Sequence, residues 1–467
     1  MSNKLFATIA VVLVVALIGG GAIIFIASSG RNKTATTTKK TTDKNAKTTL
    51  TIWRAFDDDL AFSRLIESYQ ENNPNVTIKY VKKDLADYEA QSLNALAAGT
   101  GPDLWSIKND WMSKHRDKLI PMPDNFFVNP KKNEARDNAT LYKDVWAPVT
   151  TSTNIADNKV YGVPLSVDTL VLYVNLDLWG EARKAYRNAN AENINFDDAL
   201  FRNSPATWND LEGELKYLTK KDAKGNLTQS GIALGTSNNV PNSADILSLL
   251  MLQNGATMVD SIGKAARFNA FDNGPDNKPV YKGTKALEFY TSFADSANSN
   301  YSWNGGQANA LDQFVSGKLP MMIGWQFMND IIKQRAPTLN FDVASVPQVK
   351  GSPEVNYASF WTETVTNNSR NSEAAWDFLA TIALRPNSYL SATKRSTALL
   401  EDVKANQKSD IYAKQTLTAK TWNKGKSFEA VDIIFNDLIN NVSGNHQPAQ
   451  TSIDSAATKV TELLQKE

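Results

Sequence analysis

The sequence predicts an α/β fold of two or three domains, in which mostly parallel sheets are flanked by helices. Three observations lead to this prediction. The chain of 467 residues is too long for one ordinary hydrophobic core. Residues 50–107 alternate between strand and helix patterns, which is typical of parallel strands joined by right-handed crossovers. The run LVLYV at residues 170–174 indicates a strand that is buried on both faces.

The composition excludes several functional classes. Lys plus Arg number 50 and Asp plus Glu number 49, so the chain lacks the positive charge expected of a nucleic-acid binder. The absence of cysteine excludes a thiol nucleophile and a lipoprotein-type thioether anchor, and the two histidines, His115 and His446, argue against zinc or haem. We therefore predict no metal and no cofactor. Many of the eleven tryptophans lie in loops or at strand ends, where aromatic rings often bind ligands.

The first predicted element is a membrane-spanning helix. Residues 5–27 contain no charged side chain. At ~1.5 Å per residue a helix of this stretch is about 34 Å long, enough for a hydrocarbon core of ~30 Å. Because the apolar region of a cleavable signal is usually shorter, we predict an uncleaved transmembrane anchor in residues 1–28, with cleavage after residues 27–29 as the alternative. Residues 29–48 are rich in Thr and Lys and are predicted to form a disordered tether.

The folded part begins with alternating strands and helices. Strands are predicted at residues 50–53, 76–80 and 103–107, separated by a helix that starts near Leu60 and by a second helix at residues 85–98. In open parallel sheets, ligands bind beyond the carboxyl ends of the strands. Here those ends are residues 53–57 and 107–111.

Three aspartates, residues 57–59, follow the first strand and allow two interpretations. Aspartate at a helix N-cap or first turn satisfies free backbone N–H groups and suits the helix dipole. One of the three could instead face a ligand cleft. A calcium loop is excluded because the required alternation of oxygen ligands around a glycine is missing. Arg54 could likewise pair with Asp57 or contact a ligand.

The segment VYGVPLSVDTLVLYVNLDLW at residues 160–179 contains polar side chains inside an apolar strand. Ser166, Asp168 and Thr169 stand where a buried strand should be apolar. A buried carboxylate needs hydrogen-bonding partners, or water and a ligand. Asp168 is therefore a candidate binding residue, and a solvated strand end is the alternative.

The rest of the chain continues the α/β pattern. Thr207 begins a helix with a capping-box arrangement, and residues 235–239 form a polar loop. The strand at residues 319–325 ends in Gly324 and Trp325, and a tryptophan at that end can form the floor of a pocket. Further strands are predicted at 232–234, 341–346 and 357–365, and further helices at 245–253, 286–293, 308–315, after Asn371, at 428–440 and at 452–464.

Four blocks of the sequence carry a family resemblance: LTIWRAFDD, AAGTGPDLWSIKNDWM, the segment at residues 160–179, and FVSGKLPMMIGW. In this order and with these separations, the chain resembles the sugar-binding receptors of ABC importers, the maltose-binding-protein-like members of extracellular solute-binding protein family 1. The resemblance covers residues 49–464. It implies a two-lobed, periplasmic-binding-protein-like (type II) fold, with residues 49–158 and 357–397 in the N-terminal lobe and residues 159–356 and 398–467 in the C-terminal lobe.

The resemblance also implies binding residues. Asp57 matches the acidic residue after the first strand, and Asp168 matches the carboxylate of the strand that joins the lobes. Trp111 stands where the family has a basic residue. Carboxylates and amides can bind sugar hydroxyls, and tryptophan rings can cover apolar sugar faces. The complete set of candidate ligand-binding residues is Arg54, Asp57, Asp110, Trp111, Asp168, Asn238, Asn239, Trp325 and Trp361.

The function implied by the resemblance is that of a monomeric receptor that captures a carbohydrate and delivers it to the permease of an ABC importer. The basic residues Arg31, Lys33, Lys39 and Lys40 follow the predicted anchor, and taken alone they would place the folded part in the cytoplasm. The resemblance implies the opposite, and we predict a binding domain on the extracellular face of the cell membrane.

Two alternatives remain at this point. The same fold could bind a peptide, a polyamine or a phosphorylated polyol. A membrane-anchored polysaccharide-cleaving enzyme would need a pair of carboxylates across the cleft, and Asp57 and Asp168 could form such a pair.

Overall fold

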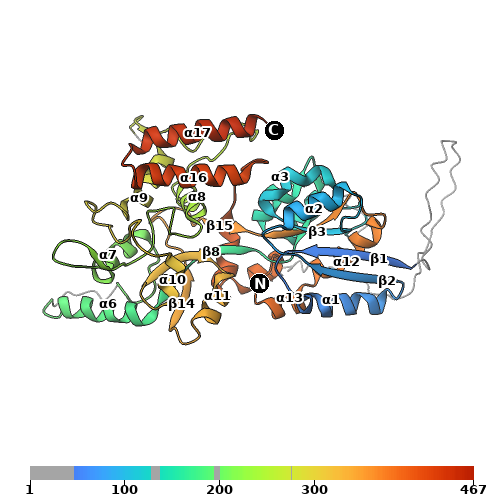
Figure 1. The fold of residues 1–467 in the computed structure, drawn as a ribbon, viewed down its shortest axis with the longest axis horizontal. Helices are drawn as coiled ribbons and strands as arrows, with labels where there is room; N and C mark the ends of the chain where they lie inside the picture. Colours follow the sequence, from blue (N-terminus) through green and yellow to red (C-terminus); the bar gives the residue numbers. More distant parts are fainter. Residues whose placement is uncertain (1–46, 128–136, 194–199, 275, 467) are drawn as a thin grey trace, which may run out of the picture.

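The computed structural model describes residues 47–127, 137–193, 200–274 and 276–466, and it has two lobes side by side (Figure 1). The predicted anchor and nearly all of the predicted tether lie outside these residues. Within the described ranges, the structure contains no helix that is long and apolar enough to cross a membrane.

The first lobe is built on a mixed sheet with the strand order β2-β1-β3-β16-β4, and β7 also pairs with β16. β1 runs parallel to β2 and β3, whereas β16 is antiparallel to its neighbours. The strands are β1 (Thr48–Arg54), β2 (Val76–Lys82), β3 (Leu104–Lys108), β4 (Leu119–Ile120), β7 (Val163–Pro164) and β16 (Trp361–Thr366), with a separate hairpin of β5 (Ile155–Ala156) and β6 (Lys159–Val160).

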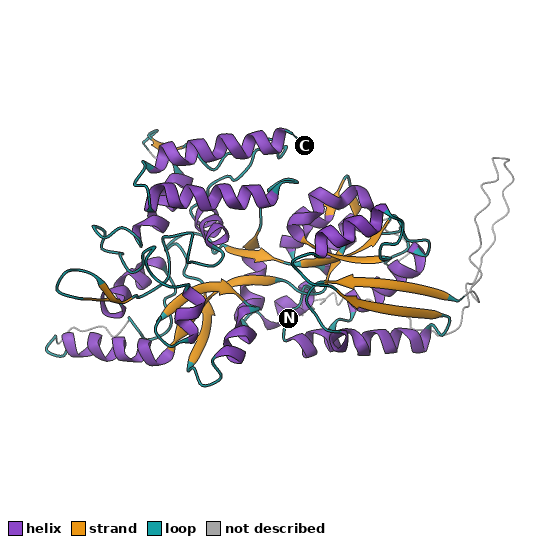
Figure 2. Cartoon of the chain, viewed as in Figure 1, coloured by secondary structure: helices purple, strands orange, loops and turns teal. Residues whose placement is uncertain are grey.

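Helices cover both faces of this sheet (Figure 2). The buried side chains of α1 are Phe62, Leu65 and Tyr69, which follow helical spacing and join the core of the lobe. The helices are α1 (Asp59–Asn72), α2 (Tyr88–Ala97), α3 (Met112–His115), α4 (Asn138–Val145), α5 (Thr151–Asn154), α12 (Ser372–Leu384), α13 (Asn387–Thr393) and α14 (Leu400–Asn406), with the 3-10 turns η1 (Asn109–Trp111), η2 (Arg116–Lys118) and η3 (Pro148–Thr150).

The second lobe is organised around β8 (Asp168–Asn175), the apolar strand that the sequence singled out. β8 pairs antiparallel with β13 (Met321–Trp325) on one side, and with β14 (Phe341–Ser345) and β15 (Asn356–Ser359) on the other. The short strand β17 (Ala419–Lys420) pairs in parallel with β15. The prediction of mostly parallel sheets is therefore wrong for this lobe, and in the first lobe it holds only for the pairings of β1 with β2 and β3. A run of apolar residues shows that a strand is buried, but it carries no information about the direction of the neighbouring strands.

The helices of the second lobe pack around this sheet and against one another. Four of them form a layer beside the sheet (Figure 1): α8 (Ser243–Gln253), α9 (Lys282–Ser292), α16 (Phe428–Ser443) and α17 (Ala449–Gln465). The other elements are α6 (Leu176–Ala189), α7 (Trp208–Leu218), α10 (Ala310–Val315), α11 (Met328–Arg335) and α15 (Ile411–Thr418), with hairpins of β9 (Lys220–Lys221) with β10 (Leu227–Gln229) and of β11 (Asp272–Asn273) with β12 (Pro279–Val280).

One predicted strand is two strands in the structure. Residues 357–365 read as a single strand, but the chain changes sheets at Phe360: β15 belongs to the second lobe and β16 to the first. Most residues of both strands are buried, so the burial pattern continues across the change of sheet.

The chain passes between the two hydrophobic cores in three places. It passes from the first-lobe core to the second-lobe core between residues 167 and 170. It returns to the first-lobe core between residues 357 and 358, and enters the second-lobe core again between residues 419 and 422. The apolar side chains of Val160, Val163, Leu165 and Val167 pack in the core of the first lobe. The lobe boundaries that we drew at residues 158, 356 and 397 stay a prediction.

Several local predictions are confirmed and others differ. The capping box at Thr207 is present, with the Thr207 hydroxyl accepting from the N–H of Asp210 and the Asp210 carboxylate accepting from the N–H of Thr207. The predicted strand at residues 232–234 is only a single bridge between Ile232 and Met321. The helices α13, α14 and α15 were not predicted, because residues 387–418 are polar enough to obscure the apolar periodicity.

Glu214 on α7 is a buried carboxyl group in the second lobe, with 1% of its surface exposed. It accepts hydrogen bonds from the indole Nε1 of Trp179 and from the backbone N–H of Phe201, both at 3.2 Å. Burial raises the pKa of Glu214 to about 7, although both hydrogen bonds act in the opposite direction. The folded protein therefore holds this proton more tightly than the unfolded chain.

This difference predicts a pH-dependent stability. Between the ordinary pKa of 4.5 and the raised value of about 7, the folded state binds more protons, so stability is lost as the pH rises. From pH 5 to pH 8, the free energy of unfolding should fall by about 2–3 kcal/mol more in the wild type than in Glu214→Gln. Urea unfolding at several pH values measures this. The exposed Glu181→Gln on α6 should keep the wild-type slope, and equal slopes in all three proteins would contradict the prediction.

Candidate functional site: a cavity between the lobes

A cavity of about 470 Å³ lies between the two lobes. Residues within 109–116 and 152–153 form its first-lobe wall, from η1, α3, η2 and α5. Residues within 252–259, at the end of α8 and after it, and 421–424, between β17 and α16, form the wall of the second lobe. We call this the inter-lobe cavity. Its volume lies in the range typical of small-molecule sites.

The walls of the inter-lobe cavity combine polar and apolar groups. Amide and hydroxyl side chains come from both lobes, for example Ser113 and Asn423, and the second lobe adds apolar surface through Leu252 and Met258. Three charged residues, Asp110, Arg116 and Lys424, also line it. Such a lining can bind a polar solute that also presents C–H faces.

Asn109 directly follows β3, and its hydrogen bonds hold the chain at the start of the first-lobe wall. It is buried, and its side-chain oxygen accepts from the backbone N–H of Phe360 at 3.2 Å. Its amide donates to Asp110 Oδ1 at 3.0 Å. Asp110 is thereby held at the carboxyl end of a strand, which is where open sheets bind ligands.

Charges at the second-lobe wall are paired in a buried cluster. Lys424 is 3% exposed, and its Nζ lies 2.7 Å from Asp432 Oδ1 and 3.3 Å from Asp245 Oδ1. Burial acts to lower the pKa of Lys424, but the surrounding Tyr357, Asp245 and other acidic groups hold it well above its ordinary value.

The first-lobe wall holds a second pair, since Lys108 Nζ lies 3.1 Å from Asp110 Oδ2. Burial acts to raise the pKa of Asp110, but the cations Lys108 and Lys424 keep it below its ordinary value. Asp110 is therefore an ionised hydrogen-bond acceptor in the cavity at neutral pH.

The two lobes touch beside the cavity. Phe428, the first residue of α16, is 6% exposed and packs in an aromatic and aliphatic cluster whose other members, including Trp111 and Met112, all belong to the first lobe. Next to it, Lys114 Nζ lies 3.2 Å from Glu429 Oε1, and Ser113 Oγ donates to Asn423 Oδ1 at 3.4 Å. The structure thus shows the lobes in contact along the cavity.

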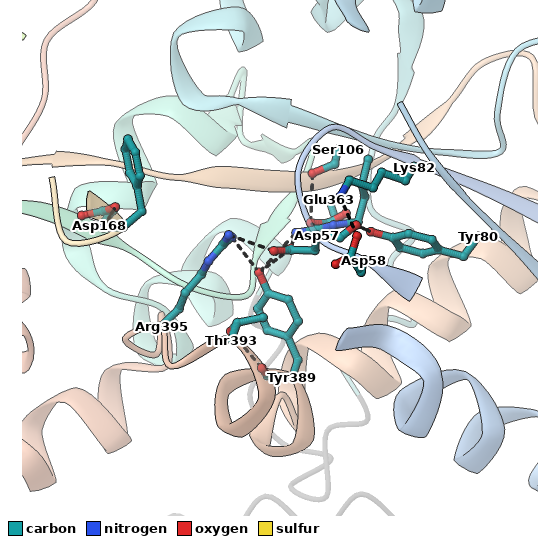
Figure 3. A network of polar contacts seen from close by, with 12 residues as sticks. Asp57, Asp58, Tyr80, Lys82, Ser106, Asp168, Glu363, Tyr389, Thr393 and Arg395 are labelled. Carbon is teal, nitrogen blue, oxygen red and sulfur yellow. Dashed lines mark hydrogen bonds and ion pairs between the residues drawn. The ribbon is translucent and has the colours of Figure 1, made fainter. Parts of the chain in front are cut away.

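A buried ion network lies at the end of β1 (Figure 3). Arg54 is 1% exposed and pairs with Glu363 of β16 and, at 2.7 Å, with Asp57. Arg395 pairs with the other oxygen of Asp57 at 2.8 Å. The hydroxyl of Tyr389 donates to Asp57 at 3.0 Å and accepts from both arginines, Arg54 at 3.2 Å and Arg395 at 3.0 Å.

This network bears on two candidate residues. The structural pairing of Arg54 with Asp57 is confirmed. Both oxygens of Asp57 are occupied by protein donors, and neither residue lines the inter-lobe cavity. Their role as ligand contacts stays a prediction. The helix-capping alternative applies to Asp58, which occupies the N-cap position of α1 without a capping hydrogen bond and pairs with Lys82.

Asp168 lies at the junction of the lobes, at the start of β8. Its carboxylate accepts from the backbone N–H of Gln326 at 2.8 Å and from that of Phe327 at 3.3 Å, just beyond β13. Burial raises the pKa of Asp168 to about 7, while the two backbone N–H groups and Arg395 act to lower it. In Figure 3, Arg395 lies between Asp168 and Asp57. Asp168 thus has the partners that a buried carboxylate needs.

The candidate tryptophans lie in two different places. Trp111 and Trp361 pack edge to face, with ring centroids 5.5 Å apart, in a cluster with Phe56 and Tyr88. Trp325 is buried at the end of β13, beside the ring of Tyr357. None of the three lines the inter-lobe cavity, and their role as sugar platforms stays a prediction.

The two candidate asparagines differ from each other. Asn238 is exposed. Asn239 is buried, and its side chain accepts from the indole of Trp303 at 2.9 Å and donates to the carbonyls of Asn304 and Gln307. These contacts hold the loop that follows Trp303. Ligand binding by either asparagine stays a prediction.

Sequence reasoning missed most of the cavity lining. Of the nine candidates, only Asp110 lines the cavity, whereas Arg116 and Lys424 were not proposed. Glu363 did leave a signal, because a carboxylate in the middle of a buried strand needs hydrogen-bonding or charged partners. No comparable signal marks Lys424, which lies in a polar stretch.

The described residues contain no group of three or more His, Cys, Asp or Glu side chains arranged to hold a metal ion. The carboxylates of the cavity and of the β1 network are instead paired with lysine and arginine. The arrangement can bind a solute through hydrogen bonds and ion pairs.

Comparisons with solved structures agree with this architecture. The chain is similar to a cyclic α-maltosyl-1,6-maltose binding protein from Arthrobacter globiformis, with 20% identity, a TM-score of 0.68, and coverage of 90% of this chain and 99% of that one. A sugar-binding protein from Xanthomonas citri gives 19% identity, a TM-score of 0.68 and coverage of 90% and 98%. A solute-binding protein of an ABC transporter from Thermotoga lettingae, solved with α-D-tagatose, gives 18%, 0.64, and coverage of 89% and 100%.

At these identities the three structures establish the fold, which is the two-lobed α/β fold of solute-binding proteins. The family model of the bacterial extracellular solute-binding protein matches residues 52–386, well over half of the sequence. The chain belongs to the bacterial extracellular solute-binding protein family.

Proposed function

We propose that this chain is the substrate-binding component of an ABC importer, which captures an extracellular carbohydrate in the inter-lobe cavity and delivers it to a membrane permease. The observation that carries the proposal is the construction of the cavity from both lobes, with amides, hydroxyls and an ionised carboxylate on its walls. The sugar ligands of the Arthrobacter and Thermotoga proteins support a carbohydrate as the class of solute.

A ligand in this cavity would favour the closed arrangement of the lobes. It would contact Asp110 and Ser113 on one wall and Thr257 and Asn423 on the other. Only a ligand with a higher affinity for the closed state can shift the population toward it. Sugar hydroxyls, which both donate and accept hydrogen bonds, suit walls of this composition.

We further propose that the protein is a monomer held at the cell membrane by residues 1–28, with the binding lobes on the extracellular face. The support is the uncharged stretch of residues 5–27, followed by the Thr- and Lys-rich stretch to residue 48. Such a tether would let the receptor reach a permease in the same membrane.

A catalytic function has less support. The carboxylates considered for polysaccharide cleavage were Asp57 and Asp168, and Asp57 is neutralised by two arginines and a tyrosine hydroxyl. Both of its oxygens are thus already engaged by protein donors and are not free to act on a substrate. The family and the similar structures consist of binding proteins.

Ligand titrations with the full chain test the proposal. Intrinsic tryptophan fluorescence and melting temperature would be measured with neutral and acidic mono- and oligosaccharides, and with peptides, polyamines and phosphorylated polyols. We expect saturable binding of a carbohydrate that is returned unchanged. Asp110→Asn should weaken it at least tenfold, because a hydrogen bond to a charged group contributes about 1.5–3 kcal/mol.

The matched control is Asp124→Asn, which neutralises an exposed carboxylate of the same lobe outside the cavity. It should leave the affinity unchanged. Binding of a peptide, a polyamine or a phosphorylated polyol in place of every sugar would refute the carbohydrate proposal while keeping the receptor. Release of shortened saccharides would refute a purely binding function.

A further inference from the structure

Arg116 differs from the other charged residues of the inter-lobe cavity. It belongs to η2, lines the cavity and is half-buried. Its guanidinium carbon lies 6.0 Å from the centre of the Tyr161 ring. No ion pair in the described part of the chain includes Arg116.

Each of the other charged residues around Arg116 has a partner of opposite charge. In the cavity walls, Asp110 pairs with Lys108, and Lys424 pairs with Asp245 and Asp432. The cations beside Arg116 in the sequence also have partners, because Lys114 pairs with Glu89 and Glu429, and Lys118 pairs with Asp117. Among these cations of the described chain, Arg116 is the one without a carboxylate partner, and it lines the cavity.

We propose that Arg116 selects a carbohydrate that carries an anionic oxygen group, a carboxylate or a sulfate. This inference rests on the proposed function and adds the class of sugar. A guanidinium group presents a planar fork of N–H donors that matches two anionic oxygens at once. Closure of the lobes around the ligand removes water from the pair and strengthens it.

The cavity carboxylate does not oppose such a ligand. Asp110 pairs with Lys108, and the positive charges of Lys108 and Lys424 both lower its pKa. An anionic sugar can therefore place its hydroxyls near Asp110 and its acidic group on Arg116. A neutral sugar offers the guanidinium group only uncharged hydroxyl acceptors, and these hydrogen bonds are weaker than those to a carboxylate or a sulfate.

Matched pairs of sugars test the proposal with the full chain. The probes are galactobiose with digalacturonate, cellobiose with cellobiouronate, and galactose with galactose 6-sulfate, titrated by calorimetry. For the wild type we expect the acidic member of at least one pair to bind tenfold or more tightly than its neutral partner, with an affinity that falls as sodium chloride rises. The uronate and sulfate pairs show which acidic group is preferred.

Two variants separate the role of Arg116 from net charge. Arg116→Gln should lose 10- to 100-fold in affinity for the acidic sugar and should abolish the preference over the neutral one. Arg64→Gln removes one exposed positive charge from α1 of the same lobe and should behave as the wild type. Equal or better binding of neutral sugars would overturn the inference and keep the proposed function. No binding of any sugar, neutral or acidic, would overturn both.

Discussion

Replacement of Arg54 by methionine is expected to destabilise the protein by about 3–5 kcal/mol, the usual cost of leaving buried ionic partners uncompensated. Arg54 is 1% exposed and lies between two buried carboxylates, Asp57 and Glu363. Methionine fills a similar volume, so the loss would come from the missing charge and hydrogen bonds. The free energy of unfolding from chemical denaturation measures the effect.

Two further variants test the cause of this loss. Arg54→Lys keeps the charge but cannot bridge Asp57, Glu363 and the Tyr389 hydroxyl with a planar fork, so it should fall between the wild type and Arg54→Met. Arg64→Met, on the exposed side of α1, should change the stability by less than about 0.5 kcal/mol. A loss below about 1 kcal/mol in Arg54→Met would show that the network contributes little net stability.

Replacement of Lys424 by methionine is expected to cost about 2–4 kcal/mol, somewhat less than Arg54→Met because Asp245 and Asp432 are partly exposed. The variant would leave both carboxylates of the second lobe without their common cation. It would also remove one of the two cations that lower the pKa of Asp110 across the cavity. Chemical denaturation again measures the loss.

The pH dependence gives this prediction a second readout. A carboxyl group with a lowered pKa stabilises the fold above its ordinary value of 3.8, and this stabilisation is lost as the pH falls. The difference between wild type and Lys424→Met should therefore shrink between pH 7 and pH 3. Lys420→Met, at an exposed site in the neighbouring β17, should match the wild type. A difference that is constant with pH would show that packing, not charge, causes the loss.

The sequence by itself determined the local elements and the lobe architecture. The spacing of Phe62, Leu65 and Tyr69 predicted α1, and the residues after Thr207 predicted a capping box that is present. The apolar run at residues 170–174 predicted the central strand of the second lobe. These features depend on residues that are close in the sequence, and their periodicity records which side chains are buried. The family resemblance supplied the two-lobed fold.

Only the tertiary structure decided strand directions and the composition of the site. Residues 357–365 are largely buried and read as one strand, but this pattern does not show that Phe360 separates two sheets. The inter-lobe cavity gathers Asp110, Arg116 and Lys424 from segments about 300 residues apart, and Arg54 meets Glu363 over a similar separation. Sequence patterns report whether a side chain is buried or exposed. They do not report which distant side chain it meets, because that depends on how the two lobes are folded and joined.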